Sequence, residues 1–556
     1  MLRSAASALI MLALSAPICL FAQTTVFTST PKTISTPGDN GPPKLIVAIS
    51  VDQLSADLFA EYRGEFTGGL KRLQHGAVFP SGYQSQSATE TCPGHATILT
   101  GVRPGRAGII ANDWIDLSIS REDKTVYCAE DEAVAGSTSS KYTVSDKHLK
   151  VPTLGERVKS ANPATRVVSV AGKDRAAVML GGHNVDELWF WSGKEFASYA
   201  DRKMPVAVSR ANISAAAEIA AGSDAVNLPA FCSSHSRAIS LGSGKSVGDG
   251  LFVRKGGDAR EWRSSPAFDG AVLNLAGDLA IDMQLGKGAA TDVLAIGASA
   301  TDYIGHTYGT SGSEMCVQLL QLDEHLGGLF ARLDNAALNY IVVLTADHGG
   351  HDLPERLREL AVADAQRITA SVTPEAIGGE IAKAMKLKVQ PLRSGGVGDV
   401  WIDLSLKGAQ KTKVLNAAVA AYRAHPMVAA VFTKAQIAAT VVPNTPPESW
   451  SILERVRASF DPERSGDFYV ALKSHVTPIA DGTKGYVATH GSVWDYDRRV
   501  PILFWHKDMA RFEQPLSVET VDIAPTLAAF IKLPVAAGEF DGRCLDLEAG
   551  TGSTCE

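Results

Sequence analysis

The chain has 556 residues, of which 45% are hydrophobic and 20% are charged, and its formal net charge is -7. This composition lies in the range of globular proteins and disfavours both disorder and a coiled coil. The acidic charge, without any basic tract, argues against nucleic acid as a partner. The length allows one large domain with insertions or two domains.

The amino terminus has the pattern of an export signal. Basic Arg3 precedes a predominantly apolar run over residues 9–22, and polar residues follow it. We therefore expect a signal peptide over residues 1–22 and a secreted or periplasmic protein. A membrane anchor is the alternative, but the run is short for a bilayer span and no later segment is comparably long and apolar. Residues 23–43, rich in Thr, Ser, Pro and Gly, are expected to form a flexible leader.

Six cysteines follow residue 22, an even number in a chain bound for an oxidising compartment. Disulfides are therefore expected, and the pair that the spacing favours is Cys544 with Cys555. The other pairings stay open. No two cysteines have the Cys-x-x-Cys spacing of a structural zinc site, which disfavours thiolate metal binding.

Uninterrupted apolar runs rich in β-branched residues indicate strands buried on both faces of a parallel sheet. They cover residues 45–51, 166–171, 293–300 and 340–346. Further strands are expected at residues 400–404, 468–472 and 500–505, the second of them returning to or bordering the core. Expected helices cover residues 54–75, 316–333, 374–388 and 521–531.

This order of elements predicts an α/β fold with a largely parallel central sheet flanked by helices. The core is expected in three parts, over residues 44–190, 286–351 and 466–556. Two segments without comparable strand patterns, residues 190–285 and 352–465, are expected to be insertions that form cap or crown segments.

Potential metal ligands follow three of the expected core strands. They are Asp52, Asp302, His306, Asp347 and His348. Open α/β sheets bind ligands at the carboxyl ends of their strands. Asp302 and His306 are four residues apart, so one helical turn would direct both to the same point. With His490, from a later loop, these carboxylates and imidazoles suffice for two metal ions with three protein ligands each.

Residues 89–101 place hydroxyl side chains before a Pro-Gly turn and a short apolar run, the pattern of a helix amino terminus. The pattern alone is also ordinary turn chemistry, but beside the strand-end residues it makes Thr91 the candidate nucleophile. The Asn112 amide, in a glycine-rich turn, could donate to an oxyanion. Lys173 and Arg175 follow a strand and could reach one phosphate, with solvated loop charges as the alternative.

In chain order these motifs resemble the alkaline phosphatase superfamily. They are Asp52, Thr91-Cys92-Pro93-Gly94-His95, Asn112, Lys173-Asp174-Arg175, Asp302-x-x-x-His306, Asp347-His348-Gly349 and His490-Gly491-Ser492. Within the superfamily the chain is most similar to the secreted bacterial, Sphingomonas-type alkaline phosphatases that use a threonine nucleophile. The match covers most of the expected core, and the insertions carry no comparable motif.

The resemblance implies two Zn²⁺ ions and a division of their ligands. One zinc would bind Asp302, His306 and His490, and the other would bind Asp52, Asp347, His348 and the Thr91 oxygen. It further implies that Asn112, Lys173 and Arg175 bind the non-bridging phosphate oxygens. The implied reaction is hydrolysis of small-molecule phosphate monoesters through a phosphothreonine, with release of inorganic phosphate. By the same analogy, Lys173 would take the place of a third metal ion.

Three alternatives remain beside this interpretation. A phosphodiesterase or nucleotide pyrophosphatase of the same superfamily is disfavoured by the Lys-x-Arg pair, which suits the free charged oxygen of a monoester. A sulfatase is disfavoured because Pro93 follows Cys92 directly, whereas sulfatases need Cys-x-Pro-x-Arg. The third alternative is a non-catalytic phosphate or metal binder. His95, Asp113 and His351 lie near the motifs but are left outside the metal ligands, with His351 the strongest candidate to contact one.

Overall fold

The computed structural model describes residues 41–395 and 398–555. The expected signal peptide and nearly all of the expected leader therefore lie outside the described residues. The chain from Pro42 onward forms one compact unit. Within the described ranges, no helix combines the length and the apolar character that crossing a bilayer requires.

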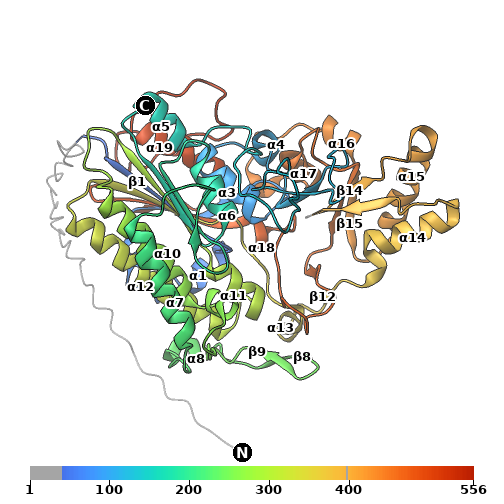
Figure 1. The fold of residues 1–556 in the computed structure, drawn as a ribbon, viewed down its shortest axis with the longest axis horizontal. Helices are drawn as coiled ribbons and strands as arrows, with labels where there is room; N and C mark the ends of the chain where they lie inside the picture. The colour runs from blue at the N-terminus through green and yellow to red at the C-terminus, as the bar shows by residue number, and fades with distance from the viewer. Residues whose placement is uncertain (1–40, 396–397, 556) are drawn as a thin grey trace, which may run out of the picture. The chain divides into compact units, whose positions relative to one another are not determined.

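A ten-stranded sheet forms the core, in the order β19-β2-β18-β11-β1-β10-β5-β6-β7, with β20 paired to β2 (Figure 1). The strands are β1 (Leu45–Val51), β2 (Ala77–Tyr83), β5 (Val167–Ala171), β6 (Glu187–Trp191), β7 (Phe196–Ala197), β10 (Asp292–Ala298), β11 (Tyr340–Thr345), β18 (Arg499–His506), β19 (Phe512–Glu513) and β20 (Val518–Glu519). Strands β11, β1, β10, β5 and β6 are parallel neighbours, and β18 pairs antiparallel with β11. The α/β class and the largely parallel sheet are thus confirmed.

Helices cover both faces of this sheet, which explains why its strands are continuously apolar. In β1, Val47 and Ile49 face one hydrophobic cluster, while Ile46 and Ala48 face another. The first face is covered by α10 (Pro266–Asp282) and α12 (Ser313–Asn335), and the second by α3 (Thr91–Thr100), α5 (Leu154–Ala161) and α19 (Ile523–Phe530). Alternate side chains therefore enter different cores, and neither face of the strand can be polar.

A second, four-stranded sheet has the order β13-β14-β16-β15. Its strands are β13 (Leu392–Ser394), β14 (Asp399–Ile402), β15 (Val428–Thr433) and β16 (Phe468–Leu472), and α14 (Pro374–Met385) and α15 (Gly408–Ala424) share its hydrophobic cluster. The strand expected at residues 468–472 to return to or border the core is β16. It pairs with β14 and β15 in this second sheet instead.

The helix expected over residues 54–75 is broken into α1 (Ala56–Tyr62) and α2 (Gly69–Leu73). The break has a tertiary cause. The Asp323 carboxylate on α12 accepts hydrogen bonds from the backbone N–H groups of Gly68, at 2.6 Å, and Leu70, at 2.6 Å. A carboxylate at this position satisfies the free N–H groups that begin a helix, so α2 starts anew there.

Residues 190–285 are more regular than the sequence suggested. They contain β7, α7 (Val206–Ala221), α8 (Ala230–Ser233), the hairpin strands β8 (Ile239–Gly242) and β9 (Lys245–Val247), α9 (Ala259–Arg263) and α10. Strand β7 extends the central sheet and α10 packs on it. The division of the chain into core and insertions stays a prediction.

The remaining helices and strands are short. They are α4 (Pro104–Ala107), β3 (Asp113–Ile115), β4 (Thr125–Tyr127), α6 (Asp174–Gly181), α11 (Ala300–Tyr308), α13 (Pro354–Glu359), β12 (Gln366–Arg367), α16 (Lys434–Ala439), α17 (Ile452–Ser459), β17 (Val476–Thr477) and α18 (Asp495–Arg498). Three disulfides join Cys92 to Cys128, Cys232 to Cys316 and Cys544 to Cys555. The last pair confirms the expected one.

Candidate active site

The carboxyl ends of three neighbouring strands gather the predicted ligands at one edge of the central sheet. Asp52 directly follows β1, Asp347 follows β11 by two residues, and Asp302 lies in the first turn of α11 after β10. Because β1 pairs with both β10 and β11 in parallel register, these residues meet although the chain separates them widely. All three carboxylates are buried.

Asp52, Asp347 and His348 form one group that could hold a metal ion, with ligand atoms within 4.8 Å of one another. His348 Nε2 lies 3.4 Å from Asp52 Oδ1 and 3.3 Å from Asp347 Oδ2. Asp52 Oδ1 and His348 Nε2 are buried without a hydrogen bond among the described residues. Buried polar atoms without partners are costly, and this donor set suits a divalent metal such as zinc.

The protonation of His348 also fits metal binding. Its Nδ1 lies 2.8 Å from the Gly349 carbonyl oxygen and donates to it, which leaves the Nε2 lone pair free. Burial lowers the pKa of His348 to about 3, so the imidazole is neutral at ordinary pH. A neutral imidazole oriented in this way can act as a ligand.

The second group of residues whose ligand atoms lie within 4.8 Å of one another is Asp302, His348 and His490, so it shares His348 with the first group. The predicted ligand His306 lies beside this group and contacts Asp302. His306 Nε2 lies 3.2 Å from Asp302 Oδ1, and His490 Nε2 lies 3.4 Å from the same oxygen. The Nδ1 atoms of the two imidazoles donate to backbone carbonyls, that of Ala488 at 2.8 Å and that of Thr89 at 2.8 Å. The His348 ring stacks on His490 with 3.6 Å between centroids, so the two groups adjoin. A carboxylate with two imidazoles is again a donor set that suits zinc.

The candidate nucleophile lies next to both groups. Thr91 is the first residue of α3 and is fully buried. Lys173 Nζ and Arg175 Nη2 each lie 3.4 Å from Thr91 Oγ1. The Asn112 side-chain oxygen accepts from the Cys92 backbone N–H at 2.8 Å, which leaves its NH₂ group as the available donor. Two donors from the start of α6 thus lie beside the Thr91 hydroxyl, and Asn112 bonds to the backbone of the residue that follows Thr91.

Lys173 forms ion pairs with one carboxylate from each of the two metal-binding groups. Its ammonium lies 2.6 Å from Asp52 Oδ2 and 2.5 Å from Asp302 Oδ2. Burial lowers the pKa of Lys173, but the attraction of Asp302 and Asp52 outweighs it and raises that pKa above its ordinary value. Burial and the neighbouring Asp347 likewise raise the pKa of Asp52. The Asp52 carboxylate and the Lys173 amine therefore compete for one proton. We assign the proton to Lys173, because its ammonium is stabilised by both carboxylates.

Three further residues contact the site, although the sequence analysis gave them no role in it. Gln53, at a positive φ of 67°, donates from its backbone N–H to Asp347 Oδ1 and from Nε2 to Asp302 Oδ1, both at 3.1 Å. His95, left outside the metal ligands, lies 3.1 Å from Asp347 Oδ2 and 2.8 Å from the Thr91 carbonyl. Glu90 accepts from the Asn112 backbone N–H at 2.7 Å. His95 lies one helical turn from Thr91, a spacing that could have indicated the contact.

His351 was the strongest sequence candidate for a contact to a metal ligand. Its Nε2 instead lies 2.9 Å from the Thr477 hydroxyl, and its Nδ1 lies 3.9 Å from Asp497. His95, which was also considered, instead contacts a predicted metal ligand, Asp347. Position along a helix, rather than closeness to the Asp347-His348 motif, decides which histidine reaches the ligands.

Tyr127 contacts the Arg175 guanidinium, and Tyr127 and Tyr142 both bond to the neighbouring Asp174. The Tyr127 hydroxyl donates to Asp174 Oδ1 at 2.7 Å and lies 3.5 Å from Arg175 Nη1, from which it can accept. The Tyr142 hydroxyl donates to Asp174 Oδ2 at 2.6 Å. Tyr127 directly precedes Cys128, whose disulfide reaches the residue after Thr91. Tyr127 and Cys128, at the end of β4, therefore contact Arg175 and the residue after the nucleophile.

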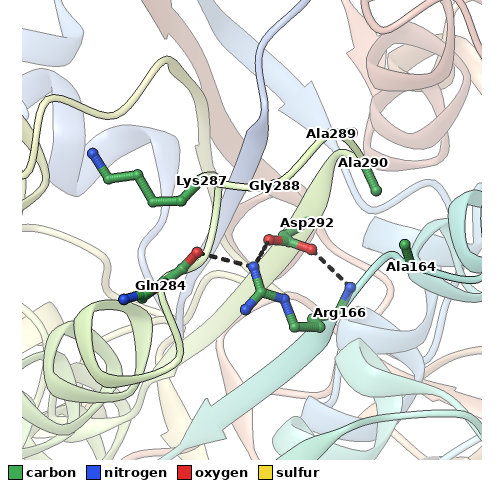
Figure 2. Close-up of a pocket in the computed structure, with 8 residues that line it drawn as sticks. All are labelled: Ala164, Arg166, Gln284, Lys287, Gly288, Ala289, Ala290 and Asp292. Atoms are coloured by element: carbon green, nitrogen blue, oxygen red, sulfur yellow. Dashed lines mark hydrogen bonds and ion pairs between the residues drawn. The ribbon is translucent and has the colours of Figure 1, made fainter.

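A separate pocket of about 290 Å³ lies at the opposite edge of the sheet, before β5 and β10 (Figure 2). There the Arg166 guanidinium pairs with Asp292 at 2.6 Å and donates to the Gln284 carbonyl at 2.9 Å. These charges satisfy each other, and none of the predicted site residues lines this pocket. The predicted site residues after β1, β10 and β11 lie at the carboxyl ends of these strands instead.

Comparison with known proteins agrees with this arrangement of sheet and site. Residues 46–493 match the family model described as type I phosphodiesterase / nucleotide pyrophosphatase. The chain belongs to this family, within the alkaline phosphatase superfamily, so the resemblance drawn from the motifs is confirmed.

Two curated relatives cover nearly all of the chain. Alkaline phosphatase PhoK of Sphingomonas sp is 55% identical over 519 residues, spanning 92% of this chain and 93% of its own. Alkaline phosphatase PhoD of Zymomonas mobilis is 47% identical over 517 residues, spanning 92% and 89%. The crystal structure of wild-type alkaline phosphatase PafA shares the fold, with a TM-score of 0.77 at 23% identity over 91% of this chain and 99% of that one.

Proposed function

We propose that the protein is a secreted, zinc-dependent alkaline phosphatase that hydrolyses phosphate monoesters through a phosphothreonine at Thr91. The observation that carries this proposal is the convergence of Lys173 and Arg175 on Thr91 Oγ1, 3.4 Å from each, beside two carboxylate and histidine groups. Two relatives that align over 92% of the chain are named alkaline phosphatases, which supports the same reaction. The disulfides are consistent with an oxidising compartment.

Two zinc ions would be held by the residues at the sheet edge. Asp302, His306 and His490 would hold one, and Asp52, Asp347, His348 and Thr91 the other. The buried Asp52 Oδ1 and His348 Nε2 atoms, which have no hydrogen bond among the described residues, support this assignment. Zinc bound there would supply Lewis-acid stabilisation to the entering and leaving oxygens.

Thr91 would carry the phosphoryl group covalently, and other side chains of the site would bind its oxygens. Thr91 Oγ1 forms a bond to phosphorus as the ester P–O bond breaks, and the alcohol departs. Water then cleaves the phosphothreonine, which releases inorganic phosphate and restores the hydroxyl. Throughout, Arg175, Lys173 and Asn112 donate to the non-bridging oxygens, where the charge of the transferring group lies.

The second candidate is a phosphodiesterase or nucleotide pyrophosphatase, the activities in the description of the family model. A phosphate diester carries a second organic group on one of the oxygens that are free in a monoester. Lys173 and Arg175 are charged and suit a free, charged phosphate oxygen. In a diester they would face the second organic group in place of that oxygen. This pair therefore favours the monoester.

Substitution of the nucleophile tests the proposal. Thr91→Ala is expected to abolish turnover of an aryl phosphate while the bound zinc, measured by elemental analysis, stays close to that of the unaltered protein. Thr91→Ser, which keeps a hydroxyl, is the matched control and should retain part of the turnover. Full turnover by Thr91→Ala would contradict the assignment. Release of phosphate that EDTA stops and added zinc restores would exclude a non-catalytic binder.

A further inference from the structure

One exposed aromatic side chain packs on His306, which contacts Asp302 of the second metal-binding group. The Tyr486 ring stacks on the His306 imidazole with 4.3 Å between centroids and 16° between planes. It is nevertheless 40% exposed. One face of the ring therefore rests on a residue of the site, while the side chain still presents apolar surface to solvent. Exposed aromatic surface at the rim of a site is a common feature of ligand recognition.

The backbone fixes the ring in this place. The Val487 backbone N–H donates to the His306 carbonyl oxygen at 2.7 Å, and the Ala488 carbonyl accepts from His306 Nδ1 at 2.8 Å. The residues that follow Tyr486 are thus bonded to His306 on both its main chain and its side chain. The position of the tyrosine relative to the imidazole is set before any substrate arrives.

The hairpin of β8 and β9 holds the loop that carries Tyr486. Lys245, the first residue of β9, donates to the carbonyl oxygens of Gly482, at 3.1 Å, and Gly485, at 3.0 Å. Ile239 and Val247 of the hairpin share a hydrophobic cluster with Val487. The β8–β9 hairpin, which belongs to residues 190–285, therefore lies next to the loop that carries Tyr486.

We propose that Tyr486 binds the leaving group, and that it favours phosphate monoesters whose alcohol carries an aromatic ring. The inference rests on the proposed function, in which the departing oxygen leaves beside Asp302, His306 and His490. An alcohol leaving next to His306 passes the exposed Tyr486 ring, and an aromatic ring on that alcohol can stack on it in an offset or edge-on manner. Lys245 acts as a positioning residue for this contact.

The test compares three monoesters of alcohols with similar acidity: benzyl, cyclohexylmethyl and methyl phosphate. Tyr486→Ala is expected to lower kcat/KM for benzyl phosphate about 10-fold, the scale of one aromatic contact, and for methyl phosphate less than about 2-fold. The saturated ester should fall by an intermediate factor. Tyr486→Phe should keep the benzyl activity, because the ring rather than the hydroxyl makes the contact.

A purely structural role for Tyr486 predicts a different outcome. If the ring only supports His306, Tyr486→Ala should lower kcat/KM for all three esters equally, together with the zinc content. That result, or an unchanged benzyl activity, would overturn the inference. If the unaltered protein hydrolyses none of the three esters, the proposed function itself is wrong, so the two failures are distinguishable.

The hairpin contact has its own matched pair of variants. Lys245→Met removes the two hydrogen bonds that hold the loop and should lower the preference for benzyl over methyl phosphate. Lys484→Met changes a solvent-exposed lysine of the same loop that makes a 3.5 Å ion pair with Asp481, and it should leave the preference unchanged. Equal preference in both variants and the unaltered protein would contradict a role for Lys245.

Discussion

The Lys173 ammonium nitrogen lies 3.4 Å from the Thr91 hydroxyl oxygen, and it also pairs with Asp52 and Asp302, one carboxylate from each metal-binding group. A single positive charge thus connects the nucleophile with both groups. Lys173→Met keeps much of the side-chain volume but removes that charge. We expect kcat/KM for a phosphate monoester to fall about 100-fold, because one donor to the transferring phosphoryl group is lost.

The loss should be smaller for a diester, since a diester has no second free oxygen for Lys173 to bind. The measurement is kcat/KM of Lys173→Met and of the unaltered protein for both ester types. Lys159→Met, which changes a lysine that pairs with Asp186 away from the site, is the control. Equal losses for monoester and diester would show that Lys173 serves only to hold the two carboxylates together.

Tyr127 is expected to act through Arg175. Its hydroxyl lies 3.5 Å from Arg175 Nη1 and is bonded to Asp174. Tyr127→Phe removes this acceptor, leaves the guanidinium less constrained and should lower monoester kcat/KM about 10-fold. Tyr142→Phe is the matched control, because Tyr142 bonds Asp174 but not Arg175, and its effect should be smaller. Product inhibition by inorganic phosphate should weaken in parallel, and unchanged inhibition would contradict the positioning role.

The disulfide between Cys92 and Cys128 should matter for activity as well as stability. Cys92 directly follows Thr91, and its backbone N–H donates to Asn112. Replacing both cysteines by serine should lower kcat and the thermal midpoint, since a cross-link contributes about 2–4 kcal/mol. The same change at Cys544 and Cys555, near the carboxyl terminus, should leave kcat unaltered. Equal kcat values for the two double variants would contradict this role.

His183 gives the protein a pH-dependent contribution to stability. Its Nδ1 lies 3.0 Å from Glu156 Oε1, and the hydrogen bond to this carboxylate raises the pKa of His183 from 6.5 to about 9. The folded state therefore binds the proton more tightly than the unfolded state. The resulting stabilisation is complete below pH 6.5 and is lost as the pH rises through about 9.

In His183→Gln this contribution is absent at every pH. The thermal midpoint should therefore fall less between pH 6.5 and pH 9.5 in the variant than in the unaltered protein. His75→Gln, which changes an exposed histidine bonded to a backbone carbonyl, is the control. Parallel pH curves for His183→Gln and the unaltered protein would contradict the assignment.

The sequence predicts most of the strands that position the site, because burial on both faces leaves a continuous apolar run. The run at residues 45–51 matches β1 in full, and the polar residues after such runs are the ones that meet at the sheet edge. The position of these residues directly after strands predicts that they meet, because the carboxyl ends of neighbouring parallel strands lie at the same edge of the sheet.

Contacts between distant segments leave no such pattern. Gln53 reaches Asp302 across 249 residues of chain, and Tyr127 reaches Arg175 from the end of the three-residue strand β4. The break between α1 and α2 depends on Asp323, which lies more than 250 residues further on. The sequence therefore predicts which residue types converge, whereas the residues that orient them emerge only from tertiary packing.

The most direct test of the central claim is kcat/KM of the zinc-loaded protein for a monoester and a diester of the same alcohol, for example p-nitrophenyl phosphate and methyl p-nitrophenyl phosphate. Lys173 and Arg175, both within 3.4 Å of Thr91 Oγ1, predict a clear preference for the monoester. A preference for the diester would contradict the monoesterase assignment and favour a phosphodiesterase.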